Sequence, residues 1–200
     1  MTTQVDFGPV ARRLGEVAAA VPDSALGDPT PCEGYTVGDL VEHVGTLAQA
    51  FAAAAAKDAS GIGDRRPTGD ASQLPADWRT AVPAHLDALA DAWREPAAWT
   101  GFTRVGGVDL PGEMAGVIAL DELVLHGWDL ARATDQAFEP DPAALEVVHG
   151  FLADLATPEM AAIREGRFGP VVEVAEDRPL LDRVVGLAGR DPDWSPGSPG

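Results

Sequence analysis

Apolar residues recur at helical spacing along most of this 200-residue chain. Positions three or four residues apart lie on one face of a helix, so such stripes predict amphipathic helices. The first stripe consists of Val10, Leu14, Val17 and Val21, and it predicts a helix over residues 5–21. A second helix is expected from Val37 to about Ala59. It follows Thr36 and Asp39, whose spacing is typical of a capping box.

The second half of the chain carries further elements of the same kind. Apolar periodicity predicts helices over 78–93, 112–134 and 142–155. Pro83 lies inside the first of these, so it must either kink that helix or mark the start of its more regular part. Between them, residues 98–110 are β-branched and glycine-rich, which predicts a short hairpin or an extended crossover.

Residues from Phe168 onward predict an extended piece and then a helix that Asp177 caps and Gly189 stops. We expect the last residues, 193–200, to be frayed. The simplest fold is mainly all-α: an antiparallel four-helix bundle with a short hairpin or crossover. We assign residues 1–160 to the bundle and residues 161–200 to a small C-terminal extension packed on it.

The charge balance narrows the classes of partner. Lys and Arg number 14 against 32 Asp and Glu, which gives a formal net charge of −18. Such a surface repels nucleic-acid phosphates and anionic lipid, so we expect neither partner. A single cysteine excludes an intramolecular disulfide. With no secretory signal or membrane span recognisable in the sequence, this favours a cytoplasmic protein.

Three side chains form a candidate metal site. Glu122 and His126 lie one helical turn apart, where their Cβ atoms are about 6 Å from each other. His43 lies at the margin of the apolar face of its own helix, so a facing antiparallel helix would let it supply a third ligand. Two imidazoles and a carboxylate are typical of zinc sites with an open position, and equally of non-haem iron.

Alternative interpretations of these and other polar side chains remain open. A Glu and a His at this spacing are also common as ordinary surface contacts. Asp129 could orient an imidazole, but we favour a solvated side chain. We interpret His85 and His149 as core histidines, and Cys32 as a small buried residue rather than a nucleophile.

Three blocks of the sequence resemble a known family. They are TPCEGYTVGDLVEHV (30–44), DELVLHGWDLARAT (121–134) and the ending FGPVVEV with LLDRVVGLAGRDPDW (within 168–194). Together they are similar to the DinB-like metal-binding superfamily, and within it to the actinobacterial group related to the N-terminal domain of mycothiol-dependent maleylpyruvate isomerase. This resemblance implies a four-helix bundle with His43, Glu122 and His126 as metal ligands.

The resemblance also implies a chemistry. Characterised members use a divalent metal, usually zinc, to hold mycothiol as its thiolate; nickel or iron are further options. We therefore expect a zinc-dependent mycothiol S-transferase or an isomerase-like enzyme, with a small thiol and an electrophile as partners. S-transfer is favoured because the characterised isomerase has an additional C-terminal domain, whereas about 40 residues follow Met160 here. The alternatives are a non-catalytic bundle that binds a small ligand and a protein with a structural metal.

Overall fold

The computed structural model describes residues 4–58, 61–62 and 69–197 and is mostly helical, as predicted. Short 3-10 turns and a two-stranded antiparallel sheet join the helices. None of the helices in these residues is long and apolar enough to cross a membrane. The helices are α1 (Gly8–Ala19), α2 (Val37–Ala55), α3 (Trp78–Trp93), α4 (Gly112–Ala133), α5 (Pro142–Leu155), α6 (Ala161–Arg164) and α7 (Leu180–Leu187). The strands are β1 (Phe102–Val105) and β2 (Val108–Pro111).

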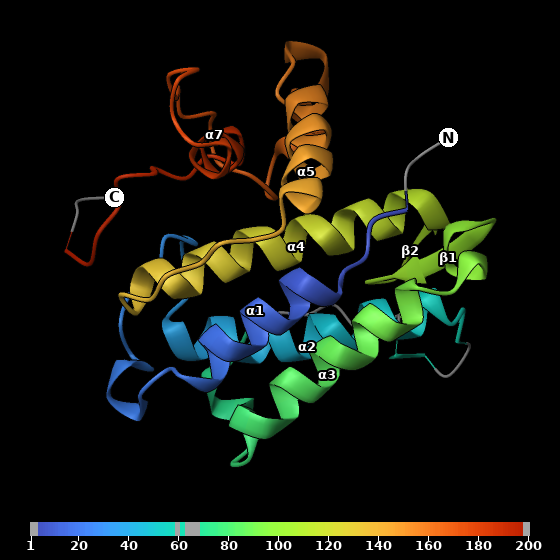
Figure 1. Cartoon of the computed structure of the whole chain (residues 1–200), viewed down its shortest axis with the longest axis horizontal. Coiled ribbons are helices and arrows are strands. Elements are labelled where there is room, and N and C mark those ends of the chain that lie inside the picture. The colour runs from blue at the N-terminus through green and yellow to red at the C-terminus, as the bar shows by residue number, and fades with distance from the viewer. Residues whose placement is uncertain (1–3, 59–60, 63–68, 198–200) are drawn as a thin grey trace.

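Helices α1, α2, α3 and α4 pack against one another as one group. Helix α3 packs on α1 and α2, and α4 packs on the same two helices. Helix α5 packs on α4 and on α7, so Figure 1 shows α4 between two groups of helices, with α5 and α7 on the far side from α1 and α2. The division into residues 1–160 and 161–200 stays a prediction. In the structure, α5 of the first part packs directly against α7 of the second.

Local signals in the sequence fix several element ends. The capping box at the start of α2 is confirmed: the Asp39 amide donates to the Thr36 hydroxyl, and the Thr36 amide donates to the Asp39 carboxylate. Residues 102–111 form a hairpin rather than a crossover. Gly106 and Gly107 both have positive φ, which the tight two-residue turn between paired Val105 and Val108 requires.

Other expectations about element ends are wrong. Helix α1 begins at Gly8 and α2 ends at Ala55; the predicted end at Ala59 falls outside the described residues. Asp177 does not cap α7, whose N-terminal flanking residue is Pro179 without a side-chain cap. The tail is less frayed than expected because Trp194 packs against the core. Residues 198–200 lie outside the described part.

Helix α4 is covered nearly all round. Every residue from Leu123 to Ala131 is buried, because α1 and α2 pack on one side of α4 and α5 packs on the other. Such close packing demands small residues at contacts. A Cβ atom on Gly127 would lie 2.2 Å from the Phe138 ring, so the ring occupies the space of a side chain.

A buried ion pair joins α4 to the C-terminal segment. Asp129 is fully buried, which shows that the prediction of a solvated side chain is wrong. Arg190 reaches it from the turn after α7 with two hydrogen bonds, Nε to Oδ1 at 3.1 Å and Nη2 to Oδ2 at 2.9 Å. The Asp129 pKa is lowered: burial opposes ionisation, but the charge of Arg190 and the hydrogen bonds from His126 and Arg190 outweigh it.

The contact at Gly127 generates a stability prediction. Gly127→Ala should destabilise the fold by about 1–3 kcal/mol, because the new methyl group displaces the buried Phe138 ring. Gly150 is a matched control in α5, where a Cβ atom meets nothing within 4 Å. Gly150→Ala should stabilise by about 0.5–1 kcal/mol through helix propensity. Urea unfolding of both variants measures the difference, and a gain in stability for Gly127→Ala would contradict the packing account.

The ion pair generates a second prediction. Arg190→Met should lower the free energy of unfolding by about 3–5 kcal/mol, because it leaves the Asp129 carboxylate buried without its cation. Arg178→Met is the control, since it removes an exposed pairing with Asp182 and Asp193 and should leave stability nearly unchanged. Equal effects of the two substitutions in urea unfolding would show that burial of the Asp129 charge is not what makes Arg190 important.

Candidate metal centre

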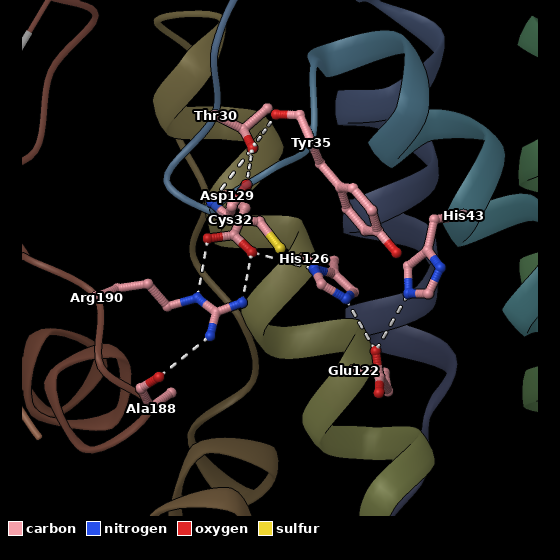
Figure 2. A network of polar contacts seen from close by, with 9 residues as sticks. All are labelled: Thr30, Cys32, Tyr35, His43, Glu122, His126, Asp129, Ala188 and Arg190. Atoms are coloured by element: carbon pink, nitrogen blue, oxygen red, sulfur yellow. Dashed lines mark hydrogen bonds and ion pairs between the residues drawn. The ribbon is translucent and has the colours of Figure 1, made fainter. Parts of the chain in front are cut away.

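The structure brings together the three side chains that the sequence singled out. His43 comes from α2, and Glu122 and His126 come from α4. One ligand atom from each lies within 4.8 Å of the other two. The Glu122 Oε2 atom lies 2.9 Å from His126 Nε2 and 3.8 Å from His43 Nε2, so both rings present the same nitrogen to one carboxylate oxygen (Figure 2).

The cluster is buried on one side and open on the other. The His126 side chain is 8% exposed and that of His43 is 13% exposed, whereas 30% of the Glu122 side chain is exposed. The two imidazole rings meet edge to face, with centroids 5.0 Å apart. The cluster is therefore accessible to solvent mainly at Glu122, while the two imidazole rings are largely covered.

His126 is held from behind by Asp129. Its Nδ1 atom lies 3.0 Å from Asp129 Oδ2, the oxygen that also accepts a hydrogen bond from Arg190 Nη2. When Nδ1–H donates to this carboxylate, the Nε2 lone pair is free to face Glu122 and a bound cation. Asp129 therefore orients His126, and Arg190 in turn holds Asp129 in place.

The electrostatics of the cluster favour a cation. Burial opposes ionisation of Glu122, but the hydrogen bond from His126 and the nearby His43 imidazole outweigh it and lower the Glu122 pKa. Burial also opposes a charge on His126, but hydrogen bonds to Asp129 and Glu122 outweigh it and raise the His126 pKa to about 9. Without a metal, a proton on His126 balances these carboxylates, and a metal ion would take the place of that proton at Nε2.

The donor set fits a divalent metal. Two imidazole nitrogens and one carboxylate oxygen are a known zinc ligand set that leaves a further position open, and the same donors suit iron or nickel. The three converging atoms and the orienting Asp129 together make the arrangement that such a site needs. That His43, Glu122 and His126 bind a metal stays a prediction.

Two further side chains line the site. The Tyr35 ring lies 5.3 Å from the His43 ring, and burial followed by neighbouring negative charge raises the Tyr35 pKa. Cys32 is partly buried and its sulfur lies within 4.8 Å of ligand atoms of His126 and Asp129. Burial, followed by the charge of Asp129, raises the Cys32 pKa to about 12, so the thiol stays protonated and is not a nucleophile at neutral pH.

The other two histidines do not join the cluster, and the prediction that they are core residues is wrong. His85 is half-buried and lies 3.3 Å from the Gln49 side-chain amide. His149 is also half-buried and lies 3.2 Å from the Arg183 guanidinium.

Sequence reasoning missed the parts of the site that come from tertiary packing. Arg190 and Asp129 are 61 residues apart, and no spacing pattern connects them. Tyr35 gave no signal beyond its place just before the capping box. The one clue was that Arg190 and Tyr35 both fall within the blocks that carry the family resemblance.

Comparison with known proteins agrees with that resemblance. The family model described as the mycothiol maleylpyruvate isomerase N-terminal domain matches residues 7–131, which include all three candidate ligands. Uncharacterized proteins from two strains of Mycobacterium tuberculosis are each 28% identical over 186 aligned residues. That alignment covers 82% of this chain and 85% of the relative.

Solved structures show a similar fold. The crystal structure of the mycothiol-dependent maleylpyruvate isomerase aligns with a TM-score of 0.64 at 16% identity over 94% of this chain and 88% of that chain. A histidine-to-alanine mutant of that isomerase aligns with a TM-score of 0.55 at 18% identity over 73% of this chain and 66% of that chain. The first alignment extends through most of both chains, which removes the length difference that favoured S-transfer over isomerisation. On the match of its family model, this chain belongs to the mycothiol maleylpyruvate isomerase N-terminal domain family.

Proposed function

We propose that this protein is a divalent-metal-dependent enzyme that uses mycothiol, or a closely similar thiol, as the nucleophile toward a small electrophile. The observation that carries the proposal is the convergence of His43, Glu122 and His126 on one point, with a side open at Glu122. Three protein ligands leave a position free for a further ligand, as in catalytic rather than structural zinc sites.

The charge of the donor set suits a sulfur anion. Two neutral imidazoles and one carboxylate leave a divalent ion with one net positive charge. When bound, that ion supplies the field that keeps a thiol deprotonated and therefore nucleophilic. Asp129 holds His126 in the tautomer that this requires, and Arg190 keeps Asp129 ionised. The surrounding helices exclude water from the back of the site.

Transfer of the sulfur to a neutral electrophile is the reaction we favour. Arg190 is the cation beside the site, and its three nitrogens already bond to Asp129 and to the Ala188 carbonyl. Arg190 is therefore not available to bind a substrate carboxylate. The net charge of −18 also disfavours anionic substrates generally. Isomerisation of a conjugated acid is the second candidate, because the isomerase shares this fold over most of its chain.

Removing one candidate ligand tests the proposal directly. His126→Ala should abolish tight zinc retention and should also abolish conjugation of mycothiol to monobromobimane, because the cation loses one of its three donors. His149→Ala is the matched control, since this half-buried histidine contacts Arg183 away from the cluster. Elemental analysis of purified protein and a fluorescence assay of the conjugate give the two measurements.

Each result of that experiment has a defined meaning. Loss of zinc and of conjugation in His126→Ala alone supports the proposal. Unchanged zinc retention in His126→Ala would contradict it. Turnover of maleylpyruvate by the unaltered protein, without conjugation of any electrophile, would favour isomerisation over S-transfer.

Chelation separates the enzyme from the two non-catalytic alternatives. We expect a chelator to abolish thiol binding while lowering the melting temperature only modestly, because the hydrophobic core contains none of the three candidate ligands. A thermal-shift titration with and without chelator measures both effects. A ligand that stabilises the protein equally in both conditions would indicate a binding module, and collapse of the fold on chelation would indicate a structural metal.

A further inference from the structure

The hydroxyl of Tyr35 is a polar group at the site that the proposed function does not yet use. Figure 2 shows it directed toward His43, His126 and Glu122, on the same side as their ligand atoms. The Tyr35 and His43 rings lie 5.3 Å apart with their planes inclined at 52°. Within the part of the chain that the structure describes, this hydroxyl makes no hydrogen bond, so it is free to meet a bound molecule.

The backbone around Tyr35 holds its ring in place. The Tyr35 amide donates to the Cys32 carbonyl at 3.1 Å, and the Tyr35 carbonyl accepts from the Thr30 hydroxyl at 2.9 Å. The capping box that begins at Thr36 fixes the chain immediately afterwards. The hydroxyl therefore projects from a locally bonded turn rather than from a free loop.

A close neighbour confines the other side of the ring. Gly69 has a φ of +68°, and a Cβ atom there would lie 3.0 Å from Tyr35 Cζ. The phenol therefore packs close to Gly69 as well as to His43. A side chain held in this way loses little conformational freedom when a ligand binds.

We propose that Tyr35 is a thiol-binding residue, whose hydroxyl donates a hydrogen bond to the sulfur atom of the thiol that enters the open side of the His43, Glu122 and His126 cluster. This inference rests on the proposed function and names a residue for its thiol partner. A phenol has an ordinary pKa near 10 and is a neutral donor at neutral pH. A deprotonated sulfur is a charged acceptor, and hydrogen bonds to charged groups are stronger than those between neutral groups.

The sulfur is the atom best placed to receive this bond. The hydroxyl is directed toward the cluster, so the part of a bound thiol that enters the cluster is its nearest partner. The Cys32 thiol lies on the Asp129 side of His126, where His126 Nδ1 and Asp129 are already bonded to each other.

A thiol titration of the cobalt-loaded protein tests the inference. The band to follow is the sulfur-to-cobalt charge-transfer absorption, with mycothiol and ethanethiol as probes. Tyr35→Phe keeps the ring and removes the hydroxyl, so we expect an unchanged cobalt content and binding of both thiols weakened by about 10-fold or more. Thr157→Val is the control, because it removes a hydroxyl that bonds to the Asp154 carbonyl in the segment after α5. It should bind both thiols as the unaltered protein does.

The outcomes separate this inference from the function on which it rests. Equal affinity in Tyr35→Phe would overturn the role of Tyr35 and leave the proposed function intact. Weakened binding of mycothiol with unchanged binding of ethanethiol would also overturn it, because the hydroxyl would then contact another part of mycothiol. Absence of the charge-transfer band in the unaltered protein with either thiol would overturn the proposed function and this inference together.

A measurement on the unaltered protein removes any dependence on how the variant folds. Tyr35 is the single tyrosine of the chain, so protein labelled with carbon-13 at tyrosine Cζ gives one resonance from this position. In the zinc-loaded protein, addition of ethanethiol should shift that resonance as the hydroxyl gains its acceptor. A resonance that stays unchanged at a saturating thiol concentration would overturn the inference.

Discussion

Burial of charge on α4 is the constraint on which the rest of the structure depends. The stretch from Leu123 to Ala131 is covered on all sides, so a charged group within it has no water to stabilise it. Asp129 is tolerated there because Arg190 bonds to both of its oxygens and His126 bonds to one of them. The C-terminal segment is therefore more than a cover for the bundle, since it supplies the cation that makes the interior of α4 stable.

The same pairing orients one of the candidate metal ligands. Because Arg190 keeps Asp129 ionised, Asp129 can fix the His126 ring through Nδ1 and turn Nε2 toward Glu122. Glu122 in turn faces both imidazoles, and the low Glu122 pKa keeps its carboxylate charged. The cluster thus holds more negative charge than its neutral imidazoles balance. A proton on His126 supplies the missing positive charge when no metal is present, which is why the His126 pKa is raised.

The sequence predicted the features that depend on local spacing. Helical periodicity located the long helices, the Thr36 and Asp39 pair located the start of α2, and one turn of α4 placed Glu122 beside His126. The sequence did not reveal the features that depend on tertiary packing. The solvated Asp129 was expected because an amphipathic helix has one wet face, and α4 has almost none. Arg190 could not be found because a contact between residues 61 positions apart leaves no periodic trace in a single sequence.

Membership of this family leaves the reaction to be decided by the residues at the open side of the site. A fold shared at 16% identity keeps the helices and their packing, but it does not specify a reaction or a substrate. Here Asp129 is bonded to both Arg190 and His126, so in the proposed site this pair would orient His126 rather than select a substrate. Glu122, whose side chain is 30% exposed, and Tyr35 lie where substrates would reach the proposed site. In the proposed metal-loaded site a bound thiolate would offset the remaining positive charge, and Arg190 is engaged with Asp129, so no free cation would remain at this entrance to favour an anionic electrophile.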